Sequence, residues 1–66
     1  MEIRINGKSA SIASKLTLLE WLESQQLTHK RIAIEVNGAI VPKSKFSTTF
    51  IQEYDEIEVI RAVGGG

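Results

Sequence analysis

A chain of 66 residues, of which 42% are hydrophobic and 24% charged, has the size and composition of one small globular domain and is too small for a deep catalytic cleft. Eight basic residues balance eight acidic ones, which argues against nucleic acid as the main partner because phosphate binding depends on a basic surface. The chain has no cysteine, so disulfides, thiolate metal sites and cysteine nucleophiles are excluded.

The N-terminal residues predict a β-hairpin and argue against a signal peptide. Apolar and charged residues alternate over Met1–Ile5, which is strand periodicity. Asn6-Gly7 suits the two positive-φ positions of a type I′ turn, and residues 8–12 then form a returning strand. No apolar run approaches the ~20 residues of a membrane span. We therefore expect a cytoplasmic protein with no membrane partner.

A capping box predicts the start of a helix. In Thr17-Leu18-Leu19-Glu20 the threonine hydroxyl can accept from the third helical N–H, and the glutamate can reach back to the threonine N–H. The helix is predicted over Leu18–Gln26, with Leu27 packing just beyond its end. Four apolar residues share one broad face of this helix: Leu18, Leu19, Trp21 and Leu22.

The next segment predicts a second hairpin. Alternation over Ile32–Val36 indicates a strand, Asn37-Gly38 is a second turn signal, and Ala39–Val41 is a short apolar run. Pro42 lacks an N–H, which stops ladder pairing there or confines it to an edge strand.

The remaining third of the chain predicts one more strand after an irregular segment. Residues 43–49 are polar around Phe46, and three residues are expected to pack in the irregular stretch that follows: Phe50, Ile51 and Tyr54. Ile57 and Val59 alternate with glutamates and form the last strand, with Ile60 and Ala62 on the opposite face. The order β-β-α-β-β-β predicts an α+β fold, with one helix on one face of a mixed sheet.

Catalytic constellations are absent from the sequence. His29 lies in a polar connection with no neighbouring carboxylate in sequence, the serines have no adjacent base, and no pair of residues has metal-ligand spacing. We therefore expect no enzyme and no metal site. Four acidic residues cluster near the last strand: Glu53, Asp55, Glu56 and Glu58. They form either a solvated strand edge or an acidic rim that steers a basic partner toward the C-terminus.

The C-terminal tail is the predicted site. The last strand runs into Gly64-Gly65-Gly66, which is either a frayed end or a thin, extendable tether. Four extended residues reach about 13 Å, far enough to bring a terminal carboxylate into the active site of another protein. A carboxylate is a poor electrophile, and an ATP-dependent enzyme could convert it to an acyl adenylate from which AMP leaves readily.

Several segments of the sequence together resemble the ThiS family, the ubiquitin-like sulfur carriers of thiamine biosynthesis. They are the β-β-α-β core, residues 36–42 (Val-Asn-Gly-Ala-Ile-Val-Pro), residues 54–57 (Tyr-Asp-Glu-Ile) and the terminal Gly65-Gly66. The resemblance covers essentially the whole chain. It implies a β-grasp domain over residues 1–63, with the first and last strands parallel and adjacent at the sheet centre, and a flexible tail over residues 64–66.

The resemblance also implies a chemistry and a set of partners. A ThiF-like adenylyltransferase would adenylate Gly66 with Mg-ATP, and sulfur from a cysteine desulfurase would convert the adenylate to a thiocarboxylate. A ThiG-like thiazole synthase would then take the sulfur into the thiazole ring. Outward residues of the last strand would dock these enzymes: Ile60, Ala62 and Val63. The free carrier would be a monomer without a bound cofactor, and Gly64 would lengthen the tail.

Three alternatives stay open at this point. A MoaD-like small subunit of molybdopterin synthase uses the same thiocarboxylate chemistry for another acceptor. A ubiquitin-like modifier would be joined through Gly66 to lysines of other proteins. A plain interaction module would need no terminal glycines at all.

Overall fold

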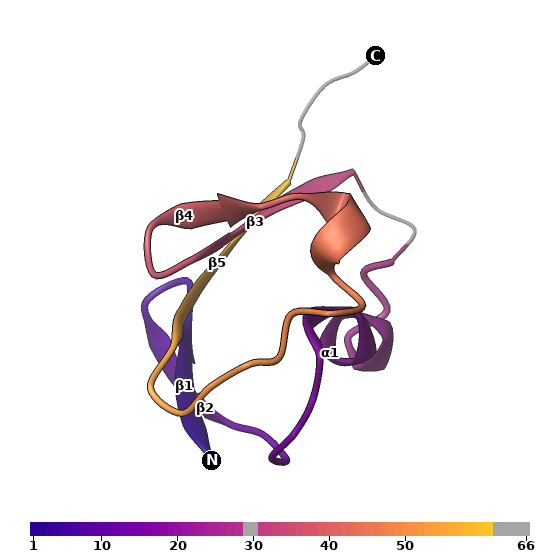
Figure 1. Cartoon of the computed structure of the whole chain (residues 1–66). Coiled ribbons are helices and arrows are strands. Elements are labelled where there is room, and N and C mark those ends of the chain that lie inside the picture. The colour runs from indigo at the N-terminus through magenta and orange to yellow at the C-terminus, as the bar shows by residue number, and fades with distance from the viewer. Residues whose placement is uncertain (29–30, 62–66) are drawn as a thin grey trace.

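The structure is a computed structural model that describes residues 1–28 and 31–61 (Figure 1). In this part of the chain the elements are β1 (Glu2–Ile5), β2 (Lys8–Ser11), α1 (Leu18–Ser24), β3 (Ile32–Val36), β4 (Ala39–Val41), the short 3-10 helix η1 (Lys43–Lys45) and β5 (Glu56–Arg61). The predicted order of strands and helix is confirmed, and η1 is an addition to it. None of the described helices is long and apolar enough to cross a membrane.

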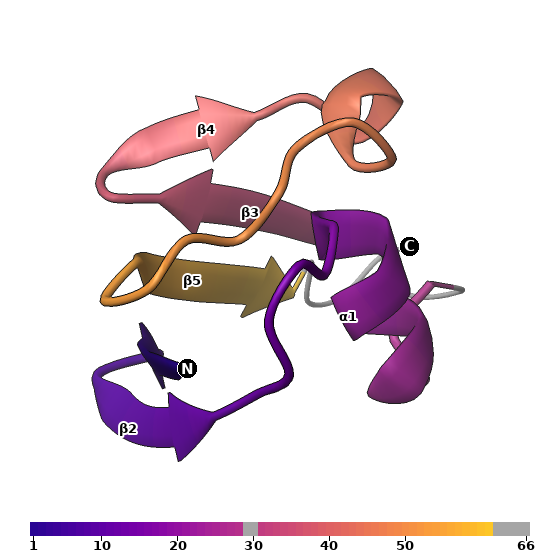
Figure 2. The same cartoon turned by 60° about the horizontal axis from the view of Figure 1, so that its bottom comes forward.

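The five strands form one mixed sheet in the order β2-β1-β5-β3-β4 (Figure 2). β5 pairs parallel with β1 and antiparallel with β3, so the last strand joins two hairpins into one sheet. This arrangement confirms the expected parallel and adjacent first and last strands. It also places the strand that leads to the tail at the centre of the fold.

Two Asn-Gly turns close the hairpins as predicted. Asn6 and Gly7 have φ angles of 50° and 82°, and Asn37 and Gly38 have φ angles of 52° and 86°. Positive φ at both central positions is the signature of the type I′ turn, whose twist matches that of the flanking strands.

The helix begins with the predicted capping box. The Glu20 N–H donates to Thr17 Oγ1 at 3.1 Å, and the Thr17 N–H donates to Glu20 Oε1 at 2.9 Å. The helix ends at Ser24, two residues earlier than predicted, because Gln26 takes a left-handed conformation with φ 59°. The N–H groups of Gln26 and Leu27 then donate to the carbonyls of Glu23 and Leu22, which is a Schellman motif.

The core lies between α1 and one face of the sheet. Eight residues are buried there: Ile3, Leu18, Trp21, Leu22, Ile34, Phe46, Ile51 and Ile57. Leu19 and Leu27 are partly buried and pack against this cluster, which confirms the predicted helix face and the position of Leu27.

Two residues that were predicted to pack in the core are exposed, and one aromatic residue of the polar segment 43–49 is buried. Phe50 is 54% exposed and Tyr54 72% exposed, so the prediction for both is wrong. Phe50 forms a bridge with Thr17, and side chains alternate in an extended segment, so burial of Ile51 turns its neighbour Phe50 outward. Tyr54 sits in a turn at φ 67°. Phe46, which directly follows η1, is instead buried.

Candidate functional site

The strand β5 is anchored on both sides by asparagine side chains. Asn6 Oδ1 accepts from the Val59 N–H at 2.8 Å, and Asn37 Oδ1 accepts from the Glu56 N–H at 2.9 Å. The backbone N–H groups of Asn6 and Asn37 also donate to the carbonyls of Ile57 and Glu56. The two turns therefore fix the position of the strand that carries the candidate tail. The sequence signalled these residues as turns, and their side-chain role had no local signal.

Asp55 is a structural residue and not part of an acidic rim. Its side chain is buried, Oδ1 accepts from Asn37 Nδ2 at 2.9 Å, and Oδ2 accepts from the Gln52 N–H at 2.8 Å. Its carbonyl accepts from the Arg4 N–H at 2.9 Å. Asp55 therefore ties the chain before β5 to the turn between β3 and β4 and to β1.

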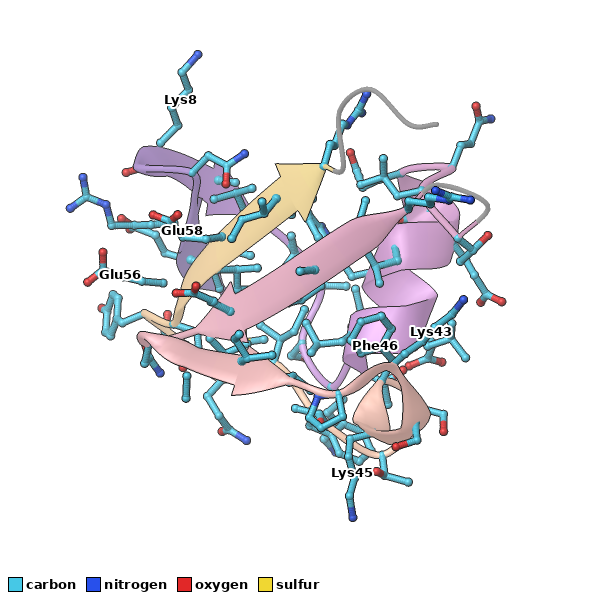
Figure 3. The ribbon with its side chains drawn as sticks, turned by 90° about the horizontal axis from the view of Figure 1, so that it is seen from above. Lys8, Lys43, Lys45, Phe46, Glu56 and Glu58 are labelled. Atoms are coloured by element: carbon cyan, nitrogen blue, oxygen red, sulfur yellow. The ribbon has the colours of Figure 1, made fainter. Side chains whose placement is uncertain are left out.

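The outer face of the sheet, opposite α1, carries exposed apolar and acidic side chains. Ile57 is buried and Val59 half-buried, whereas Glu56, Glu58 and Ile60 on the same strand are exposed. The predicted outward position of Ile60 is thereby confirmed, with 44% of its surface exposed. Figure 3 shows Glu56 and Glu58 on the side of the molecule away from α1.

Neighbouring strands extend this outer face. Ile60 lies opposite Ala33 of β3, and Glu58 lies opposite Glu35. Glu35 in turn lies opposite Ile40 of β4, which is 67% exposed. The outer face therefore combines apolar side chains with a row of carboxylates.

A groove lies at the end of the sheet where β5 finishes. We call it the end groove. Apolar side chains of the helix and η1 regions line it, namely Leu19, Leu22, Leu27 and Phe46, and three cationic residues stand on its border, namely Arg31, Lys43 and Arg61. Arg61 pairs with Ile32 at the start of β3, so the described part of β5 ends at this groove.

The predicted tail lies outside the described residues. The tail residues are Gly64, Gly65 and Gly66. Three further residues that the sequence singled out also lie outside the described residues: His29, Ala62 and Val63. The predicted boundary between residues 63 and 64 lies there as well. Of the predicted site residues, the structure therefore places Ile60 alone. In the described residues no group of acidic or histidine side chains could hold a metal ion.

A mixed five-stranded sheet with one covering helix and a parallel pairing of the first and last strands define a small β-grasp domain. The chain belongs to the ThiS family, whose model matches residues 3–66. The predicted family is thus confirmed.

Curated relatives and a solved structure agree with this assignment. The chain is 36% identical over 66 residues to an uncharacterized protein, ycf40, of Porphyra purpurea, with 100% of this chain and 93% of the relative covered. It is 31% identical to the sulfur carrier protein ThiS of Bacillus subtilis, covering 97% and 98% of the two chains. A crystal structure of the thiamine biosynthesis protein ThiS from Geobacter metallireducens superposes with a TM-score of 0.87 at 26% identity, covering all of both chains.

One further relative is much longer than this chain. The thiazole synthase of Magnetococcus marinus is 32% identical over 66 residues, which cover all of this chain and 20% of the synthase. A segment similar to this domain is therefore part of the same polypeptide as that synthase.

Proposed function

We propose that this chain is a sulfur carrier of thiamine biosynthesis and that the terminal carboxylate of Gly66 carries the sulfur. The observation that carries the proposal is the match to the ThiS family over residues 3–66, which includes Gly66. The relatives named as sulfur carriers support the same role. The chain acts as a co-substrate of partner enzymes and not as a catalyst.

The proposed chemistry has three steps. A ThiF-like adenylyltransferase transfers AMP from Mg-ATP to the Gly66 carboxylate and releases pyrophosphate. A persulfide supplied by a cysteine desulfurase attacks the acyl carbon and displaces AMP, and a thiol then cleaves the S–S bond to leave the thiocarboxylate. The thiocarboxylate sulfur is a better nucleophile than a carboxylate oxygen and attacks the acceptor substrate.

The proposed acceptor enzyme is a ThiG-like thiazole synthase. One fifth of the Magnetococcus marinus synthase matches this chain, and a second thiazole synthase, from Paramagnetospirillum magneticum, shows the same coverage. A shared polypeptide keeps carrier and acceptor together at high effective concentration, which suits partners that act in succession.

The tail suits this transfer because of its terminal residues. Glycine lacks a Cβ, so Gly65 and Gly66 can pass a narrow channel and adopt backbone angles that are closed to other residues. Gly64 lengthens the thin part of the tail. The exposed side chain of Ile60, together with Ala62 and Val63, forms the proposed enzyme-docking residues of the last strand.

The proposed compartment is the cytoplasm, because adenylation needs ATP and a thiocarboxylate needs a reducing environment. The proposed free state is a monomer. The ATP and Mg²⁺ are held by the activating enzyme in this scheme.

The decisive measurement is the intact mass of the chain after incubation with the adenylyltransferase, Mg-ATP, a desulfurase and cysteine. We expect a gain of about 16 Da, which corresponds to replacement of one carboxylate oxygen by sulfur. A reaction without ATP is the control and should leave the mass unchanged. If an enzyme set that is active on another carrier produces no gain, the proposal is wrong.

A further inference from the structure

The end groove combines an apolar floor with a cationic border. Leu19 and Leu22 come from α1, Leu27 follows the helix, and Phe46 follows η1. Arg31, Lys43 and Arg61 lie around this floor, and none of the described residues that line the groove is acidic. In a chain of zero formal net charge this is a local excess of positive charge. The complementary ligand is therefore acidic as well as apolar.

The dimensions of the groove favour a protein segment over a small molecule. Its volume is about 1020 Å³, at the upper end of the range for small-molecule pockets, and it is partly open to solvent. A small ligand needs an enclosed site with convergent polar groups to bury most of its surface. An open groove with apolar floor and charged border instead has the anatomy of a protein interface, with an apolar centre and a polar rim.

The groove is continuous with the proposed docking face. Ile60 and Ala33, which lie opposite each other on the outer face of the sheet, also line the groove. A partner that approaches the end of β5 therefore meets both surfaces at once. Gly66 follows Arg61, the last residue of β5, by five residues, so an enzyme that holds the Gly66 carboxylate is tethered within about 18 Å of the end of this strand.

We propose that the end groove binds a segment of the thiazole synthase partner that presents apolar side chains between carboxylates. The proposal rests on the proposed function and extends it. The synthase is the chosen occupant because two thiazole synthases contain a segment similar to this chain in the same polypeptide, which keeps carrier and synthase at a high effective concentration. Apolar side chains of the segment pack on Leu19 and Leu27, and its carboxylates pair with Lys43 and Arg61.

Two lysines of the same 3-10 helix provide a matched test. Lys43 lines the groove, whereas Lys45 is not among the lining residues. Figure 3 shows Lys43 beside Phe46 on the side of α1, and Lys45 pointing away from the domain. Both side chains are exposed, so reversal of either charge changes the net charge equally and leaves the core intact.

The experiment compares Lys43→Glu with Lys45→Glu by calorimetric titration of the full-length carrier into thiazole synthase. We expect Lys43→Glu to weaken binding about ten-fold and Lys45→Glu to leave it within about two-fold. The difference between the variants should shrink at high salt, because the lost interaction is electrostatic. Circular dichroism of each variant verifies the fold.

Two results would overturn the inference. Equal binding of both variants to the synthase would show that the end groove is not the docking surface. A loss by Lys43→Glu in binding to the adenylyltransferase, with unchanged binding to the synthase, would assign the groove to the activating enzyme. The mass gain of the wild-type and Lys45→Glu chains tests the proposed function separately. A normal mass gain with equal binding of both variants would refute the inference alone, whereas the absence of a mass gain would refute the proposed function.

Discussion

The side chains of Asn37 and Asn6 make different hydrogen bonds, although both residues sit in the same kind of turn. Asn6 uses its oxygen to accept from the Val59 N–H. Asn37 uses both ends of its amide, since the oxygen accepts from the Glu56 N–H and the nitrogen donates to Asp55 Oδ1. Aspartate tolerates the left-handed backbone at both positions but retains only the acceptor.

We therefore expect Asn37→Asp to destabilise the domain by about 1–3 kcal/mol and Asn6→Asp to have little effect. In the first variant the buried Asp55 carboxylate loses a donor and faces a second carboxylate. Urea denaturation of the two variants at neutral pH measures the difference. Equal free energies of unfolding would show that the contact between residues 37 and 55 does not stabilise the fold.

Gly65 is the residue at which the thin-tail argument can be tested. We expect Gly65→Val to block adenylation because valine restricts the backbone and widens the tail, and to leave thermal unfolding unchanged because every core residue is kept. Pyrophosphate release in the presence of the adenylyltransferase is the measurement, with Ser14→Val as an exposed control away from the end groove. Normal activation of Gly65→Val would contradict the argument.

Helix α1 illustrates how element boundaries depend on single residues. The capping box set its start from sequence alone, because threonine and glutamate at that spacing satisfy two orphan N–H groups. Its end was predicted two residues late, because glutamine carries no signal for a left-handed conformation. The Schellman motif at Gln26 is built with a side chain where glycine is the usual residue.

This mismatch predicts a stabilising substitution. Gln26→Gly should raise the free energy of unfolding by up to about 1 kcal/mol, because glycine adopts φ 59° without the steric cost of a Cβ. The control is Gln25→Gly, since Gln25 has φ −95° and gains nothing from glycine. Thermal melting compares the two variants, and a lower midpoint for Gln26→Gly would disprove the prediction.

At the scale of the whole molecule, much of the fold could be predicted because its signals are local. Period-two alternation, two Asn-Gly turns and one capping box fixed the strands, the helix and the outward position of Ile60. Burial of Phe46 and exposure of Phe50 and Tyr54 could not be predicted, because they depend on the path of residues 43–55 over the core. The end groove depends on the same long-range packing.

The small core makes the molecule sensitive to single cavities. Leu22 is 1% exposed, and we expect Leu22→Ala to cost about 2–5 kcal/mol. This is comparable to the entire stability that a core of this size supplies, so the variant should be largely unfolded at 37 °C. Leu19→Ala, at a partly buried position, should cost less. A Leu22→Ala chain with a wild-type denaturation midpoint would place Leu22 outside the stabilising core.

The central strand β5 separates the sheet into two hairpins, and the backbone hydrogen bonds between these hairpins all pass through β5. A chain that ends at Asp55 would contain the hairpins β1–β2 and β3–β4 without the strand between them. We expect such a truncated chain to show no cooperative thermal transition by circular dichroism, since an isolated hairpin is marginal in water. A sharp transition near the wild-type midpoint would refute this expectation.

During synthesis on the ribosome, the same topology makes the proposed activation of the tail depend on completion of the sheet. The strand that completes the sheet is translated after both hairpins, immediately before the residues proposed to be activated. A chain in which β5 has not yet paired lacks the outer face around Ile60, so an activating enzyme that docks on this face would spend ATP only on folded carriers.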